Sequence, residues 1–266
     1  IKKMNLSPAM ESEGVLAIYT ADDLIRDGVN PYPIPGPPGD FVTQEILDQG
    51  YRNGNGEPMD PPRWLALAKD EVRYVGQPVV AILAESAENA LTASELVEVD
   101  YKELASVGTI QDAEKESAPA IWKGAPGNLL IQMEHGDAAK TDRIFAEADH
   151  VTELELRNSR LVGNAMEPRA SVCRRDPEQD RLILHAGHQA PTGLQESLCK
   201  DIFGWSTDKL RIVVGHLGGG FGIRAETYPE EIVTVYAAHK QSRPVKWNGD
   251  RTQEFYGTVH GRDQLS

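Results

Sequence analysis

Cysteine and long apolar runs are scarce in this sequence. Its only cysteines, Cys173 and Cys199, form no CxxC pair, which excludes a zinc ribbon, a haem-attachment motif and an iron–sulfur ligand set within the chain. The longest apolar run, residues 79–84, is far shorter than the roughly 20 residues of a bilayer-spanning helix. We therefore expect no membrane span.

Basic residues are also in short supply. Lys and Arg number 27 against 41 Asp and Glu, so the formal net charge is −14. A field of that sign repels phosphate groups, and we expect no nucleic-acid partner. The length of 266 residues and a hydrophobic content of 40% are enough for a buried core.

The first half of the chain predicts an alternation of strands and helices. Residues 15–19 form an apolar strand, and Thr20 is placed to cap a helix that follows it. Residues 29–63 are rich in proline and predict a long surface loop. After it, residues 78–84 predict a buried strand, Ser86 a helix cap and residues 97–101 a further strand.

The second half begins again after residues 106–135, which have no sustained period and predict a connecting segment. Helices are expected at 137–148, 192–203 and 229–240, and strands at 152–157, 169–175, 181–186, 210–214 and 244–247. The class is therefore α+β, in two parts.

The segment with the clearest chemical potential is a glycine run after the strand at 210–214. It reads Gly215-His216-Leu217-Gly218-Gly219-Gly220-Phe221-Gly222-Ile223-Arg224. Glycines allow backbone N–H groups to approach a ligand closely, so an anion or an oxo group fits such a loop. The spacing matches neither the dinucleotide GxGxxG pattern nor a phosphate loop. Taken alone, the run is as consistent with an ordinary turn.

An ordered series of segments resembles one family. The series is Met166-Glu167-Pro168-Arg169, His188-Gln189-Ala190-Pro191, the glycine run, Tyr228-Pro229-Glu230-Glu231 and Arg243-Pro244-Val245-Lys246-Trp247. It is similar to the large, molybdopterin-binding subunits of the molybdenum hydroxylases, the xanthine dehydrogenase, aldehyde oxidase and aerobic carbon monoxide dehydrogenase group. The segments at 70–79 and 97–101 resemble that family's α/β hammerhead domain.

The resemblance implies an organisation and a set of partners. We expect a hammerhead domain at 1–105, a connecting segment at 106–135 and the first part of a mixed α/β molybdopterin-binding domain at 136–266. It implies a molybdopterin cofactor, in the cytosine dinucleotide form, an iron–sulfur subunit or domain, a FAD subunit or domain, and a small-molecule substrate. The expected compartment is the cytoplasm, with the periplasm known for some relatives.

The resemblance also assigns site residues. Gln189 matches the glutamine beside the molybdenum's oxygen ligands, and Gly219, Gly220, Phe221 and Gly222 match the loop whose amides approach the cofactor. From the residues alone, a solvent-facing side chain is the favoured interpretation of Gln189, and a core side chain explains Phe221 nearly as well. No direct metal ligand is expected. Purine oxidation is disfavoured because Ala225 follows Arg224 where purine-oxidising members carry a glutamate, whereas Tyr228-Pro229 is similar to the carbon monoxide dehydrogenase branch.

Two further pairs allow chemical and structural interpretations. Glu167 and Arg169 lie two apart, so on a strand they share a face, and a structural ion pair competes with a role in proton transfer. His185 and His188 are spaced as a metal pair, but no acidic or thiol neighbour completes a ligand set, and we expect both to be unliganded.

The chain begins at Ile1 and ends shortly after a patterned segment, and we expect it to be a piece of a longer enzyme. The family's general-base glutamate is expected beyond residue 266, so no catalytic residue is assigned here. We expect the isolated chain to lack the cofactor and to be inactive. The alternative is a non-catalytic module that binds other subunits of a redox complex, in which Gln189 and the glycine loop would point apart.

Overall fold

The fold is described from a computed structural model of residues 1–266, for all residues except 33–50, 54, 61, 63 and 133–135. Most of the proline-rich stretch 29–63 therefore lies outside the described residues. The chain divides into two compact units, each built from separate stretches of sequence. Unit 1 comprises Ile1–Pro33, Arg63–Glu103 and Val162–His260, and unit 2 comprises Ile34–Pro62, Leu104–Leu161 and Gly261–Ser266. The predicted domain limits at 105 and 135 stay a prediction, because compactness divides the chain differently.

The early part of unit 1 alternates short strands and helices, as the sequence predicts. Its strands are β1 (Lys3–Asn5), β2 (Val15–Tyr19), β3 (Ala81–Ala84) and β4 (Glu98–Asp100), and its helices are α1 (Ser7–Met10), α2 (Ala21–Arg26) and α4 (Ala87–Glu95). β1 pairs with β4 and β2 with β3, both antiparallel. Ser86 caps α4 by accepting a hydrogen bond from Asn89 N at 3.1 Å. The strand predicted as buried is wrong in that respect, because β3 is half-buried along its length in a two-stranded sheet.

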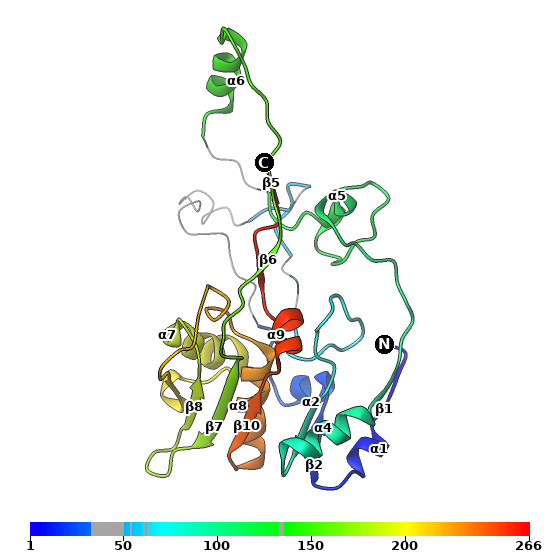
Figure 1. Cartoon of the computed structure of the whole chain (residues 1–266), viewed down its shortest axis with the longest axis vertical. Coiled ribbons are helices and arrows are strands. Elements are labelled where there is room, and N and C mark those ends of the chain that lie inside the picture. The colour runs from blue at the N-terminus through cyan, green and yellow to red at the C-terminus, as the bar shows by residue number, and fades with distance from the viewer. Residues whose placement is uncertain (33–50, 54, 61, 63, 133–135) are drawn as a thin grey trace. The chain divides into compact units, whose positions relative to one another are not determined.

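The later part of unit 1 is a four-stranded sheet in the order β10-β7-β8-β9. The strands are β7 (Ala170–Arg175), β8 (Leu182–Ala186), β9 (Leu210–Val213) and β10 (Val245–Asn248). β7 is antiparallel to β8 and β10, and β8 is parallel to β9. All four were expected from the sequence. Helix α8 (Pro229–Gln241) packs against β7, β8 and β10, as Figure 1 shows.

The remaining helices of this part are α7 (Pro191–Glu196), η3 (Ser197–Phe203), η4 (Thr207–Lys209) and α9 (Arg251–Gly257), and β11 (His260–Gly261) follows. The single helix predicted at 192–203 is thus interrupted, because η3 is a π-helix that ends at Gly204 in a left-handed conformation. Helix α9 was not predicted. It begins at Asp250, whose side chain accepts a hydrogen bond from Gln253 N at 2.8 Å.

One hydrophobic core serves both parts of unit 1. Tyr19 of β2 packs edge to face on Tyr236 of α8, with ring centroids 5.0 Å apart. The hydroxyl of Tyr236 donates to the Asp27 carboxylate at 2.6 Å, and Lys240 reaches the same oxygen at 2.7 Å. Side chains far apart in sequence therefore fold as one body. Its most buried members include Leu67, Leu184, Leu198, Ile202, Ile232 and Val235.

Unit 2 contains α5 (Ile110–Ala113), η2 (Pro126–Asn128), α6 (Ala138–Glu147) and the antiparallel pair β5 (Arg157–Asn158) and β12 (Gln264–Leu265). β6 (Leu161–Val162) follows β5 at the unit's boundary. Helix α6 confirms the prediction at 137–148, and Asp137 caps it. The strand predicted at 152–157 is wrong over most of its length: Leu154 is 71% exposed, and in this stretch the structure pairs only the last two residues, Leu156 with Ser266 and Arg157 with Leu265. An alternating pattern forms a strand only where a partner strand is available.

Candidate functional site

The sheet of unit 1 brings four connecting segments to one edge. Because β8, β9 and β10 run in one direction and β7 in the other, the carboxyl ends of three strands meet the amino end of the fourth. At this edge Asn248 of β10 pairs with Ala170 of β7, and Ser171 of β7 pairs with Ala186 of β8. The segments that lead into β7 and out of β8 and β10 therefore start at neighbouring positions. Gln189 and the glycine loop, residues 218–222, follow β8 and β9 at this edge.

Gln189 and the glycine loop are in direct contact. The N–H groups of Gly222 and Arg224 both donate to Gln189 Oε1, at 3.0 and 3.3 Å, and Gln189 N donates to the Arg224 carbonyl at 2.7 Å. A Cβ atom on Gly220 would lie 2.6 Å from Gln189 Cδ. Two donors thus occupy the amide oxygen, and within the described residues Nε2 has no partner.

Three successive backbone N–H donors lie between Gly218 and Gly222, whose own N–H groups are hydrogen-bonded. Among the residues that the structure describes, the N–H groups of Gly219, Gly220 and Phe221 donate to no acceptor, although Gly219 and Gly220 are half-buried. Gly219 has φ +116° and Gly222 φ +82°, conformations in which an L side chain is strained. The loop therefore presents a row of unpaired donors, the arrangement that binds anionic or oxo groups.

Phe221 lies at the surface. It is 73% exposed and has φ +50°, and its ring edge approaches Gly219. The alternative of a core phenylalanine is therefore wrong. A non-glycine residue in this left-handed conformation costs on the order of 1–2 kcal/mol, which the surrounding contacts must offset.

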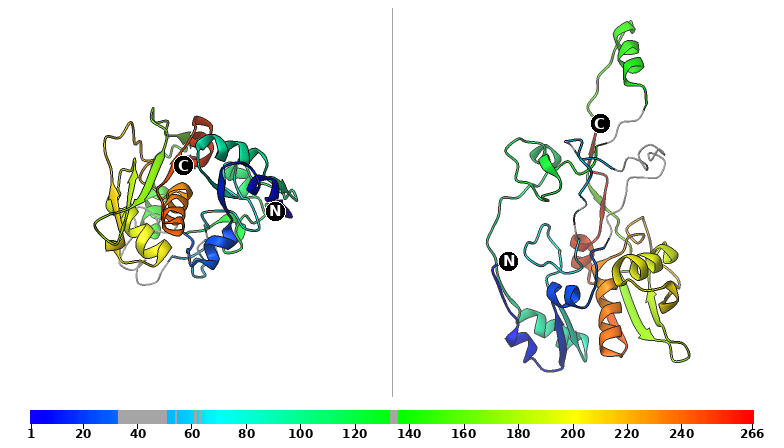
Figure 2. Two further views of the ribbon diagram at one scale, coloured as in Figure 1. Left: turned by 90° about the horizontal axis from the view of Figure 1, so that it is seen from below. Right: turned by 180° about the vertical axis from the view of Figure 1, so that it is seen from behind.

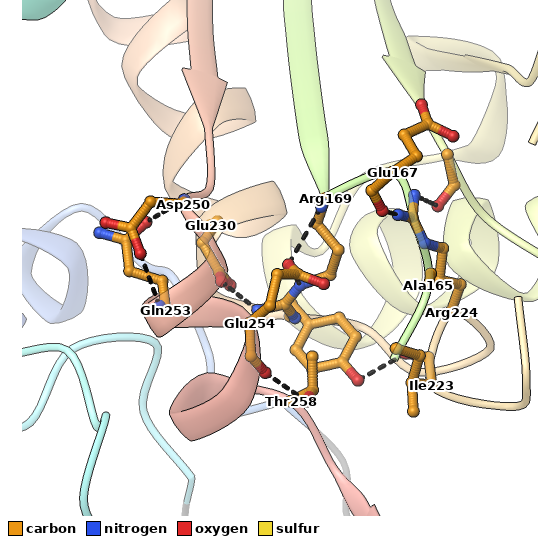
Figure 3. Close-up of polar contacts among 12 residues, drawn as sticks. Ala165, Glu167, Arg169, Ile223, Arg224, Glu230, Asp250, Gln253, Glu254 and Thr258 are labelled. Atoms are coloured by element: carbon orange, nitrogen blue, oxygen red, sulfur yellow. Dashed lines mark hydrogen bonds and ion pairs between the residues drawn. The ribbon is translucent and has the colours of Figure 1, made fainter. Parts of the chain in front are cut away.

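Glu167 and Arg169 do not pair with each other, so the predicted ion pair between them is wrong. The Glu167 carboxylate accepts a hydrogen bond from Gly218 N at 2.5 Å, at the start of the glycine loop. Arg169 points away from it into the unit, where its Nε lies 2.9 Å from Glu254 and its Nη2 2.7 Å from Glu230 (Figure 3). Residues 166–169 precede β7, so they follow no strand alternation that would put both side chains on one face.

Arg169 is the centre of a buried charge cluster. Its guanidinium also lies 3.6 Å from the centroid of the Tyr228 ring. Burial raises the pKa of Glu230 despite the nearby guanidinium, and burial raises the pKa of Glu231 to about 8. Arg169 Nη1 and one carboxylate oxygen each of Glu230 and Glu254 are buried without a hydrogen-bond partner. This cluster is structural and holds α8 and α9 against the segment that precedes β7.

His188 has a packing role. Its Nδ1 accepts from Ala190 N at 3.0 Å and its Nε2 donates to the Glu226 carbonyl at 3.1 Å, so both ring nitrogens are used. Burial lowers the pKa of His188, which favours the neutral ring that these bonds require. His185 lies on the exposed side of β8. Across the described part of the chain, no group of three or more His, Cys, Asp or Glu is arranged to hold a metal ion.

The cysteines and two surface hollows lie apart from the glycine loop. Cys173 and Cys199 are free thiols, and burial raises their pKa values to about 12 and about 11, so neither is a ready nucleophile. Two hollows of about 200 and 280 Å³ share Trp205 and His239 as lining residues. Neither is lined by a predicted site residue.

Comparison with known proteins identifies the family of the chain. Residues 121–266 match the model of the molybdopterin cofactor-binding domain, and residues 38–105 match that of the aldehyde oxidase and xanthine dehydrogenase a/b hammerhead domain. The chain therefore belongs to the family of molybdopterin cofactor-binding domains, together with the hammerhead domain that accompanies it.

Individual relatives are subunits of oxidoreductases. The chain is 32% identical over 199 residues to the 6-hydroxypseudooxynicotine dehydrogenase complex subunit gamma of Paenarthrobacter nicotinovorans, covering 75% of this chain and 24% of that protein. It is 28% identical over 275 residues to the carbon monoxide dehydrogenase large chain of Hydrogenophaga pseudoflava, covering 99% of this chain and 31% of that protein.

A solved structure has the same fold. Reconstituted CO dehydrogenase from Oligotropha carboxidovorans superposes with a TM-score of 0.81 at 25% identity, covering 99% of this chain and 31% of that chain. The chain thus spans between a quarter and a third of the length of these relatives. No helix among the described residues is long and apolar enough to cross a membrane.

Sequence reasoning missed two side chains of the site. Arg224 closes the glycine run, and its guanidinium donates to the Glu167 carbonyl, a contact that depends on where the sheet places both segments (Figure 3). Arg251 donates to the carbonyls of Ala165 and Met166, at 2.6 and 2.8 Å. Arg224 has apolar neighbours in the sequence and Arg251 follows Asp250, and neither context names the backbone carbonyls that the two side chains bind.

Proposed function

We propose that this chain forms part of the molybdopterin-binding catalytic subunit of a molybdenum hydroxylase, with Gln189, Gly219, Gly220, Phe221 and Gly222 facing the cofactor. The observation that carries the proposal is the row of unpaired N–H donors in the glycine loop beside the free amide nitrogen of Gln189. When bound, the cofactor supplies oxidation or hydroxylation of a small substrate with oxygen derived from water. A set of neutral donors suits a group rich in oxygen and anionic ligands.

Each residue has a defined task in this proposal. Gln189 directs Nε2 outward, because its Oε1 is held by the loop, and donates a hydrogen bond without adding charge. The N–H groups of Gly219, Gly220 and Phe221 donate to cofactor oxygens. Gly222 turns the loop and ties it to Gln189, and the exposed Phe221 ring keeps water from the bound group.

The proton-transfer step requires a base that we do not assign within these residues. We propose that it is a glutamate outside residues 1–266, and that this chain alone binds the cofactor weakly or not at all and has no turnover. The only exposed carboxylate bonded to the glycine loop, within the part of the chain described, is Glu167, and its hydrogen bond to Gly218 gives it a different role.

The substrate branch follows from the residues after the loop. Arg224 is buried and its backbone N–H is bound to Gln189, and the carbonyl of Glu226 accepts from His188. Ala225 supplies no carboxylate at the position after Arg224, where a purine would be oriented. We therefore propose a carbon monoxide dehydrogenase-like or xanthine dehydrogenase-like enzyme in which purine oxidation by this arrangement is disfavoured.

The whole enzyme is proposed to hold the cofactor as the cytosine dinucleotide and to pass electrons to an iron–sulfur subunit or domain and then to a FAD subunit or domain. The cytoplasm is the proposed compartment. The competing proposal, a non-catalytic interaction module, has less support, since its premise was that Gln189 and the glycine loop point apart, whereas they share three hydrogen bonds.

The test is the molybdenum content of the purified whole enzyme carrying Gly220→Ala. The new Cβ would lie 2.6 Å from Gln189 Cδ and must displace the amide, so we expect molybdenum occupancy to fall at least tenfold. Gly215→Ala is the matched control, because a Cβ there meets nothing within 4 Å. Equal occupancy in the two variants, with wild-type folding, would contradict the proposed site.

A further inference from the structure

Glu167 holds both ends of the glycine loop. Its carboxylate accepts from Gly218 N at 2.5 Å, and its own N–H donates to the Gly218 carbonyl at 3.3 Å. At the far end, Arg224 Nη2 donates to the Glu167 carbonyl. One residue outside the loop thus fixes the point where the loop begins and, through Arg224, the point where it ends.

Arg224 is a buried cation with carbonyl partners. Its side chain is 1% exposed, and besides Glu167 its Nη1 approaches the Gly187 carbonyl at 3.5 Å. Among the described residues it forms no ion pair with a carboxylate, and its Nε is buried without a partner. Burying a guanidinium in this way is unfavourable. Its position is explained by geometry, because it joins the segment before β7, the segment after β8 and the loop after β9.

Three glycines lie directly against the side chains that contact the loop. A Cβ on Gly218 would lie 2.5 Å from Glu167 Cβ, and one on Gly187 would lie 2.5 Å from Arg224 Nη1. The third is Gly220, against Gln189. Each glycine therefore leaves room for a different side chain: Gly218 for Glu167, Gly187 for Arg224 and Gly220 for Gln189. A larger residue at any of the three positions would push that side chain away from the loop.

The segment that carries Glu167 is itself fixed. Arg251, at the first turn of α9, donates to Asn164 Oδ1 at 2.7 Å and to the two carbonyls that follow it. Glu254, one turn later, accepts from the backbone N–H of Arg169 at 3.0 Å. Helix α9 therefore forms hydrogen bonds to the segment on both sides of Glu167, and these bonds fix the position of that residue.

We propose that Glu167 and Arg224 are positioning residues that hold the glycine loop in the conformation in which its three free N–H groups and Gln189 Nε2 face one ligand. The ligand's identity rests on the proposed function, whereas the fastening of the loop is a property of this chain alone. Loss of the Glu167 carboxylate frees the start of the loop and loss of the Arg224 guanidinium frees its end, although neither residue touches the ligand.

The direct test is amide hydrogen exchange of the chain, followed at Gly218, Gly222 and Arg224. Glu167→Ala removes the carboxylate but keeps the backbone carbonyl that Arg224 binds, so it is expected to speed exchange at Gly218 about tenfold, the loss that corresponds to one hydrogen bond, and to change Gly222 and Arg224 less. Glu167→Gln is expected to restore slow exchange at Gly218, since an amide oxygen accepts the same bond. Glu178→Ala, at an exposed glutamate in the turn between β7 and β8, is the control.

Unchanged exchange at Gly218 in Glu167→Ala would overturn the inference, as would equal acceleration in Glu167→Ala and Glu167→Gln. Arg224→Lys provides a second variant, because lysine keeps the charge but not the fork that spans two carbonyls. It is expected to speed exchange at Gly222 more than at Gly218. Thermal unfolding of each variant separates loop release from global destabilisation.

Molybdenum occupancy of the whole enzyme separates this inference from the proposed function. If exchange responds as expected and Glu167→Ala also lowers occupancy, with rescue by Glu167→Gln, both stand. If exchange responds but occupancy is unaffected by Glu167→Ala and by Gly220→Ala alike, the fastening is real and the proposed ligand is wrong. If occupancy falls only in Gly220→Ala, the site stands and the positioning role of Glu167 is wrong.

Discussion

At the scale of single residues, Glu231 makes the stability of the fold depend on pH. It is buried at the start of α8, accepts a hydrogen bond from Tyr228 N at 3.0 Å, and burial raises its pKa to about 8. A carboxyl group of this kind binds its proton more tightly when folded than when unfolded. Its contribution to stability is complete below the unfolded pKa of 4.5 and declines as the pH rises to about 8.

We predict that the free energy of unfolding falls between pH 5 and 8, with a slope from this group of at most about 1.4 kcal/mol per pH unit. Glu231→Gln is expected to flatten that slope, and Glu196→Gln, at an exposed glutamate of α7, is expected to leave it unchanged. Urea denaturation across this range measures it. An identical slope in wild type and Glu231→Gln would show that Glu231 does not titrate there.

Arg169 supports the site through its two carboxylate partners. Arg169→Met leaves Glu230 and Glu254 buried without their cation, and we predict a loss of about 3–5 kcal/mol in the free energy of unfolding. The matched control is Arg175→Met at the end of β7, where the side chain is exposed and the expected loss is within about 0.5 kcal/mol. Similar losses in both variants would contradict a special role for the buried cluster.

At the scale of elements, caps were the most reliable signals in the sequence. Thr20, Ser86 and Pro229 each stand at or beside the first residue of a helix that the structure confirms. These signals succeed because a cap acts on backbone groups within three residues of itself. The apolar period of residues 192–203 placed a helix correctly but gave no indication that Ser197–Phe203 is π-helical.

The cap of α4 offers a test at this scale. Ser86→Ala removes the acceptor for Asn89 N and is predicted to lower the free energy of unfolding by about 1 kcal/mol. Ser94→Ala, near the other end of the same helix, removes a bond to the Leu91 carbonyl that the helix does not need, and little change is expected. Chemical denaturation compares the two variants. Equal losses in the free energy of unfolding would show that the Ser86 cap adds no particular stability to α4.

At the scale of the whole molecule, the resemblance identified the family, the fold class and the two segments that meet, Gln189 and the glycine loop. What it did not reveal was how they are held. Glu167 was paired with Arg169 in the sequence analysis, but the sheet directs one toward Gly218 and the other toward Glu254. Such contacts join residues more than fifty positions apart, and strand order decides them, which local pattern does not encode.

The strand expected at 152–157 failed for a related reason. Its alternation is clear, but a strand is a property of two segments, and the chain around Leu154 finds no partner in the described residues of its unit. The two-part division, with limits at 105 and 135, was inferred from composition along the chain and stays a prediction. In the structure Tyr19 and Tyr236 lie in one hydrophobic core although they are far apart in the sequence. Apolar side chains are buried together wherever the fold brings them close, whatever their order along the chain.

The central claim is that Gln189 and the glycine loop face a molybdenum cofactor. The most direct measurement is anomalous diffraction at the molybdenum absorption edge from crystals of the whole enzyme. We predict one peak beside the loop, with an oxygen ligand about 3 Å from Gln189 Nε2 and within hydrogen-bonding reach of the Gly219, Gly220 or Phe221 N–H groups. A peak elsewhere, such as the hollows beside Trp205 and His239, or fully folded enzyme with no peak, would contradict the account.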